Sequence, residues 1–184
     1  MNRPATLLVL LLAGLLAGCG GGSRPTGIRA AETPADDVAE YQPRWRSHTV
    51  DSTQYRKVFL AGTIDMGRSS DWQAALVARF RDSIGGRWLF FNPRRREFHA
   101  SPAEMEYQVA WELAHLEAAD LIVMNLLGDS RSPISLLEMG LYARSGKLFV
   151  ACSPDYYRYD NVRITCRRYG VPLYDSLTAL LDDL

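Results

Sequence analysis

The chain has few of the residues on which metal and cofactor chemistry depends. Its 184 residues include only three histidines, His48, His99 and His115. These histidines lack a metal-ligand spacing such as the HExxH pair, so neither a metal nor any other cofactor is implied. The chain also lacks net charge, because 21 basic and 21 acidic side chains balance. The composition therefore gives no support for broad electrostatic attraction to nucleic acid or to an anionic membrane surface.

No hydrophobic run in the sequence is long enough to span a bilayer. The longest, residues 5–17, has about 13 residues, whereas a transmembrane helix needs about 20. Arg3 precedes the run and the string LAGC, ending at Cys19, follows it. This layout is typical of a signal peptide, and LAGC resembles the bacterial lipobox, whose cysteine becomes the lipidated first residue of the mature protein.

The lipobox resemblance implies that residues 1–19 are a lipoprotein signal and that Cys19 anchors an exported protein to a membrane of the bacterial cell envelope. An ordinary secretory signal with an incidental cysteine is the alternative. Two further cysteines, Cys152 and Cys166, are either a disulfide or two buried free thiols, since spacing alone does not decide.

The remaining chain divides into a tether and one domain. Residues 20–55 are rich in Gly, Pro, Ser, Arg and Asp and have no sustained apolar period, which predicts a flexible tether. From residue 56 to residue 184, apolar runs alternate with amphipathic stretches, which indicates an α/β domain with a parallel sheet and crossover helices. We expect five strands, at residues 57–61, 88–91, 120–124, 147–151 and 171–173.

Candidate site residues follow these strands, because ligands of open parallel sheets bind beyond the carboxyl ends of the strands. Glu138 is a further candidate, since an acid within the nearly apolar string ISLLEMGL is either ion-paired or a nucleophile. Arg94 and Arg95 either grip a phosphate or pair with acids such as Glu106, Glu112 or Glu117. The residues selected by position are Gly62, Thr63, Asn92, Arg94, Arg95, Asp129, Ser132, Ser135 and Asn161.

Seven strings, in this order, are similar to the nucleoside 2-deoxyribosyltransferase-like family. They are FLAGTI (59–64), WQ (72–73), NPRR (92–95), QVAWEL (108–113), ADLI (119–122), SPISLLEMG (132–140) and NVRITC (161–166). The resemblance covers about residues 57–172 and implies a flavodoxin-like, Rossmann-like three-layer fold.

The resemblance also implies an activity and a partner. Glu138 matches the family nucleophile, which attacks C1′ of a 2′-deoxynucleoside or deoxynucleotide and forms a deoxyribosyl ester that a second base or water then opens. Asp120 matches the family aspartate that assists the leaving base, although its position also suits a helix-to-strand cap. Asn161 either contacts the substrate through its amide or caps the helix that follows. Family members assemble with neighbouring subunits, which suggests a homo-oligomer.

Two positions depart from the family pattern. Phe59 stands where the well-studied transferases have a tyrosine, and Ser132 stands near the place of an aspartate, for which Asp129 in the preceding loop is a substitute. A second hypothesis is therefore a non-catalytic nucleotide-binding or interaction module of the cell envelope, which keeps the pocket without turnover.

The lipobox predicts that Cys19→Ser abolishes lipidation, because acylation needs the cysteine sulfur. Expression in bacteria fed labelled palmitate checks this, with Cys152→Ser as the matched control that keeps its label. Label entering the Cys19→Ser protein would contradict the anchor.

Overall fold

The computed structural model describes residues 37–83, 85–97, 99 and 101–184. The expected signal peptide, Cys19 and the first part of the expected tether lie outside these residues. Within the described part, no helix combines the length and the apolar character that crossing a membrane requires.

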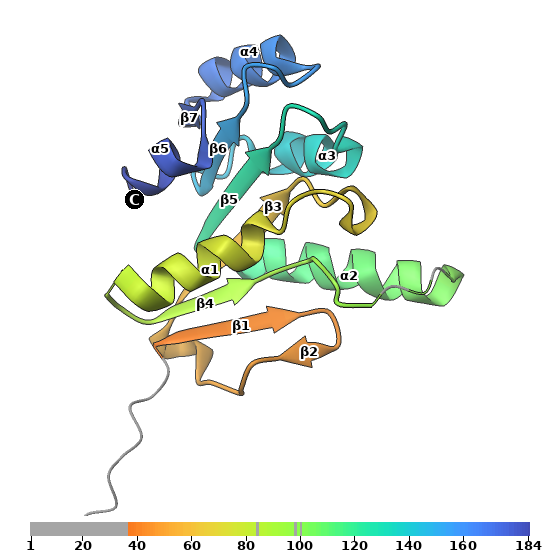
Figure 1. Cartoon of the computed structure of the whole chain (residues 1–184), viewed down its shortest axis with the longest axis vertical. Coiled ribbons are helices and arrows are strands. Elements are labelled where there is room, and N and C mark those ends of the chain that lie inside the picture. Colours follow the sequence, from red (N-terminus) through yellow and green to blue (C-terminus); the bar gives the residue numbers. More distant parts are fainter. Residues whose placement is uncertain (1–36, 84, 98, 100) are drawn as a thin grey trace, which may run out of the picture. The chain divides into compact units, whose positions relative to one another are not determined.

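Seven strands form one sheet in this part of the chain, in the order β2-β1-β4-β3-β5-β6-β7 (Figure 1). All neighbouring pairs are parallel except β1 with β2, which is antiparallel. The strands are β1 (Val38–Gln42), β2 (Trp45–Arg46), β3 (Arg56–Gly62), β4 (Trp88–Phe91), β5 (Leu121–Leu126), β6 (Leu148–Cys152) and β7 (Leu173–Tyr174).

Five α-helices and two 3-10 turns connect the strands in the same described residues. The helix α2 begins with a Ser101 cap, whose side chain accepts a hydrogen bond from the Glu104 amide, and with a proline at its first position. The elements are η1 (Ser52–Gln54), η2 (Asp65–Gly67), α1 (Trp72–Ser83), α2 (Pro102–Ala118), α3 (Pro133–Tyr142), α4 (Tyr159–Tyr169) and α5 (Leu177–Leu181).

Two hydrophobic cores lie on opposite faces of the sheet. On β3, Phe59 and Ala61 belong to the core that includes residues of α2, α3 and α4, whereas Val58 and Leu60 belong to the core of α1 and α5. The alternation follows from the two-residue period of a strand, and burial of both faces explains the apolar runs in the sequence. The result is the three-layer α/β fold that the sequence predicts.

The five expected strands are β3 to β7. Counted in chain order they lie as 2-1-3-4-5 in the sheet, which is the flavodoxin-like order. The reversal of strand order falls between β3 and β5, and ligands of such folds bind beyond the carboxyl ends of the strands at this point.

The expected tether is wrong over residues 38–46, which form β1 and β2 and extend the sheet beyond β4. Val38, Ala39 and Tyr41 are buried, but the acid at position 40 breaks the apolar run that marks a buried strand. Glu40 is buried as well, because its carboxylate accepts hydrogen bonds from Asn92 and Gln42. The folded unit therefore begins before residue 56 and has seven strands instead of five.

Gly62 permits the close approach of β3 and β5. Its φ is +125°, and a Cβ at this position would lie 2.2 Å from the carbonyl oxygen of Asn125. We expect Gly62→Ala to lower the free energy of unfolding by about 1–3 kcal/mol from backbone strain alone. The clash with the Asn125 backbone adds to this loss. Gly140→Ala is the matched control: a Cβ there meets nothing within 4 Å, so stability should rise by about 0.5–1 kcal/mol. Urea unfolding measures both, and an unchanged midpoint for Gly62→Ala would contradict the account.

Candidate active site

Three hydroxyl side chains join the loops that follow β3 and β5. The Thr63 Oγ1 atom lies 2.8 Å from the Oγ atoms of both Ser130 and Ser132, and it accepts a 3.0 Å hydrogen bond from the Leu127 amide. Thr63 and Ser130 are buried. Two predicted site residues, Thr63 and Ser132, are thus brought together, and Ser130 is a third member that the sequence pattern did not single out.

Ser132 directly precedes α3, and Pro133 occupies the first helical position. Its backbone is left-handed, with φ of +42°, and its side chain does not bond to the helix amides. The hydroxyl instead binds Thr63 and Ser130. The Ser132 hydroxyl therefore joins the loops that follow β3 and β5, and the start of α3 lacks the usual side-chain cap.

Glu138 lies in the middle of α3 and is only 8% exposed. Ser135, one turn earlier on the same helix, is 4% exposed. Burial raises the pKa of Glu138 to about 8, with a further contribution from the negative charge of Glu112. Among the described residues no basic side chain forms an ion pair with Glu138. The structural ion pair, one of the two interpretations of this acid, is therefore not found in this part of the chain.

Glu112 on α2 is the acidic neighbour of Glu138. Its Oε1 atom accepts a 2.7 Å hydrogen bond from the Gln108 amide. Burial raises the pKa of Glu112, while the Gln108 hydrogen bond and the nearby charge of Arg95 act in the opposite direction. From the sequence we expect Glu112 only as an ion-pair partner of Arg94 or Arg95. The sequence does not show which helix packs against α2 at this position.

Arg94 holds the loop after β3. Its guanidinium donates hydrogen bonds of 3.2, 2.8 and 3.2 Å to the carbonyl oxygens of Gly67, Ser69 and Ser70, and it lies 3.6 Å from the Asp71 carboxylate. Its side chain is 12% exposed. Bonding to four partners of one loop leaves the guanidinium little capacity for the phosphate contact that we considered.

Arg95 and Asn92 are also engaged with protein groups. Arg95 forms a 2.7 Å ion pair with Glu104, so the acid-pairing alternative is the one observed, with an acid outside the expected set. The Asn92 side chain donates to the Glu40 carboxylate at 2.8 Å and accepts from the Arg94 amide at 3.0 Å. Asn92 therefore fixes the turn after β4, and Glu40 is a structural residue that the sequence pattern missed.

Asp120 lies at the opposite end of the sheet from the other candidates. It directly precedes β5, and its carboxylate accepts a 2.8 Å hydrogen bond from the amide of Lys57, near the start of β3. This is the helix-to-strand cap that its position also allowed. The structure does not bring Asp120 near the strand ends that carry Thr63 and Ser132, because a parallel strand separates its two ends by its full length.

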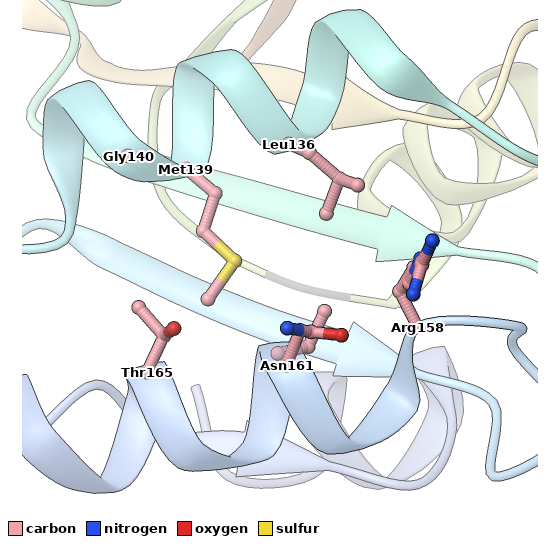
Figure 2. A pocket seen from close by; sticks show the side chains of 7 residues that line it. Leu136, Met139, Gly140, Arg158, Asn161 and Thr165 are labelled. Carbon is pink, nitrogen blue, oxygen red and sulfur yellow. The ribbon is translucent and has the colours of Figure 1, made fainter.

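Asn161 lines a pocket between α3 and α4 that Glu138 does not line. The pocket has a volume of about 330 Å³. Figure 2 shows Leu136 and Met139 reaching toward it from α3, and Asn161 and Thr165 from α4. The lining residues are Leu136, Met139, Gly140, Arg158, Asn161, Val162 and Thr165. Asp129, in the loop after β5, is exposed. Neither Asn161 nor Asp129 joins the hydroxyl cluster.

Metal-ligating groups and free thiols are the other candidates for reactive chemistry in the described residues. No group of three or more His, Cys, Asp or Glu side chains that could hold a metal is found in the described ranges. Cys152 and Cys166 are free and buried. Burial raises the pKa of the Cys152 thiol to about 12 and that of Cys166 to about 11, so both thiols stay protonated near neutral pH.

The contacts of Arg94 predict a structural effect of Arg94→Ala. Three carbonyl oxygens and one carboxylate would lose their donor, so we expect the free energy of unfolding to fall by about 1–3 kcal/mol and the amides of residues 64–71 to exchange faster. Urea unfolding and hydrogen exchange check this, with exposed Arg81→Ala on α1 as the matched control. Unchanged stability and exchange together with loss of nucleotide binding would contradict the loop role and restore the phosphate role.

Comparison with known proteins agrees with this architecture. A family model described as nucleoside 2-deoxyribosyltransferase like matches residues 55–156, more than half of the chain. The matched segment runs from the residue before β3 to the loop after β6, and it includes Thr63, Glu112 and Glu138. No curated protein matches the chain significantly. The chain belongs to the nucleoside 2-deoxyribosyltransferase-like family.

Proposed function

We propose that this protein cleaves the N-glycosidic bond of 2′-deoxynucleosides or deoxynucleotides, with Glu138 as the nucleophile. The Glu138 carboxylate attacks C1′ and the bonding electrons leave with the base, which gives a deoxyribosyl ester on the enzyme. A second base or water then attacks C1′ and frees the carboxylate. Two displacements at one carbon retain its configuration.

The observation that carries this proposal is a buried acid that has no basic ion-pair partner among the described residues. Burying a carboxylate costs free energy unless it is paired, yet Glu138 is 8% exposed and the charge that acts on it is that of another acid, Glu112. Strained or costly groups of this kind cluster at functional sites. A carboxylate in a water-poor setting interacts strongly with the positive charge that develops on the sugar during glycosidic cleavage.

The hydroxyl cluster of Thr63, Ser130 and Ser132 supports a place for the sugar at the strand ends. It fixes the two loops on either side of the point where strand order reverses, the usual location of a ligand in this fold. The buried Phe59 packs 6.3 Å from the ring of Trp111. Because position 59 is a phenylalanine, it offers no phenol to activate Glu138.

The proposal is tested by replacing Glu138. Purified wild-type protein is incubated with deoxynucleosides and deoxynucleotides, with and without a second base, and free base is followed by chromatography. Glu138→Gln keeps the side-chain shape and removes the nucleophile, so base release should fall at least about a thousandfold. Glu117→Gln is the matched control, because Glu117 is an exposed acid on the facing helix, and its rate should stay near that of the wild type.

Two outcomes would contradict the proposal. Base release by Glu138→Gln at the wild-type rate would remove Glu138 as the nucleophile. No base release by the wild type from any substrate, with nucleotide binding by calorimetry, would favour the non-catalytic module. Lipid anchoring in the cell envelope and a homo-oligomer stay predictions, and light scattering of the purified protein tests the second.

A further inference from the structure

The pocket between α3 and α4, called here the α3–α4 pocket, takes no part in the proposed reaction. Its volume of about 330 Å³ lies at the lower end of the range for small-molecule sites, about 300–1,000 Å³. Glu138 and the hydroxyl cluster of Thr63, Ser130 and Ser132 do not line it. Helix α4 also lies beyond the segment that the family model matches, residues 55–156. Neither the family match nor the proposed function therefore gives this pocket a role.

The inner side of the α3–α4 pocket is apolar. Met139 from α3 and Val162 from α4 line it and are only 3% and 1% exposed. Leu136, one turn before Met139 on α3, is half-buried and also lines it. Figure 2 shows the Met139 side chain reaching from α3 toward α4. This side of the pocket suits the apolar body of a ligand, because apolar atoms there leave no polar group unpaired.

Gly140 leaves the pocket open on the α3 side. It lines the pocket, and a Cβ at this position would meet no atom within 4 Å. Close packing therefore does not require a glycine here, although glycine inside a helix is less stable than alanine. The missing side chain provides space beside α3, and a larger residue at this position would fill it.

Three polar side chains form a row along the α4 side of the pocket. Arg158, Asn161 and Thr165 are spaced three and four residues apart, which places them on one face of the helix. In the described part of the chain, no hydrogen bond or ion pair joins these three side chains to another protein group. The Arg158 guanidinium lies 5.3 Å from the centroid of the Tyr157 ring. The donors of this row are therefore available to a ligand.

Arg158 gives the pocket a single positive charge. The seven lining residues include no acid and no second base. Asp160, the acid within α4, forms a 2.9 Å ion pair with Arg163. A carboxylate balances one positive charge, whereas a phosphate monoester carries about 1.5–2 negative charges at neutral pH. The charge of the pocket therefore favours a carboxylate.

We propose that the α3–α4 pocket binds a small amphipathic carboxylate. The ligand carboxylate lies at Arg158, whose planar guanidinium matches its geometry, and Asn161 supplies an amide beside it. The apolar body lies over Met139 and fills the space beside Gly140. This site is separate from the proposed catalytic site and does not depend on the role of Glu138.

Octanoate is a suitable probe, because it joins one carboxylate to a compact apolar chain. The full-length protein, labelled with ¹³C in its methionine methyl groups, is titrated and followed by NMR, and Met139→Leu identifies the Met139 signal. This signal should shift to saturation, whereas that of Met105, which is exposed on α2, should not. Octanol lacks the charge and acetate lacks the apolar body, so each should bind at least about tenfold more weakly.

Two substitutions separate the charge from the space. Arg158→Gln removes the charge, so octanoate affinity should fall at least about fivefold while octanol affinity stays the same. Gly140→Leu fills the pocket, so both probes should bind at least about tenfold more weakly. Arg163→Gln is the matched control, because this arginine of the same helix pairs with Asp160 and does not line the pocket. Its affinity for octanoate should equal that of the wild type.

The outcomes decide for or against the site. A Met139 shift that requires both Arg158 and the space beside Gly140, and that persists in excess 2′-deoxyadenosine, would establish it. No shift at Met139, equal affinity for octanol and octanoate, or unchanged affinity in both variants would overturn the proposal. Displacement of octanoate by 2′-deoxyadenosine would also overturn it, since the pocket would then belong to the nucleoside site.

Discussion

The pairing of β3 with β5 is the constraint on which the rest of the site depends. The two strands run side by side until Gly62 and Asn125, and the Thr63 amide closes the pair with a 2.9 Å hydrogen bond to the Asn125 carbonyl oxygen. The backbones come so close at this point that a Cβ on Gly62 has no room. Beyond it the chains diverge, and the hydroxyls of Thr63, Ser130 and Ser132 hold the two departing loops together. The strand ends at which we propose the sugar to bind are thus positioned by backbone geometry.

The reactive groups come from the helix layer above this pair. Crossover helices from neighbouring strands must pack side by side on one face of the sheet, and this brings α2 and α3 together. Their contact buries an acid from α3 beside an acid from α2. Such an arrangement opposes stability, because neither carboxylate gains a full counter-charge. It also raises the pKa of Glu138 to about 8, because burial and the neighbouring negative charge both disfavour the ionised carboxylate.

Much of the fold could be predicted from the sequence, because its central strands are apolar on both faces. Residues 57–61, 88–91, 120–124 and 147–151 all read as buried strands, and all are strands of the sheet. The edge formed by β1 could not be found in this way. Glu40 interrupts its apolar run, and the residue that satisfies Glu40, Asn92, lies 52 positions away, so no local pattern reveals the pairing.

The site was predictable where a single element determines it and not where two elements meet. Thr63, Ser132 and Glu138 follow from strand ends and from a polar residue in an apolar helix. Arg94, Arg95 and Asp120 occupy plausible positions, but their partners, which are loop carbonyls, Glu104 and the Lys57 amide, depend on packing between distant segments. Glu112 was overlooked for the same reason, since its facing helix is set by tertiary structure alone.

The central claim is that Glu138 forms a covalent bond to the sugar. The most direct test is mass spectrometry of the protein after brief reaction with a 2′-deoxy-2′-fluoroarabinosyl nucleoside, whose fluorine slows the opening of the ester. The account predicts a mass increase of one fluorosugar residue, located by proteolysis on the peptide that carries Glu138. An unmodified protein after complete release of base, or a sugar located on another residue, would contradict it.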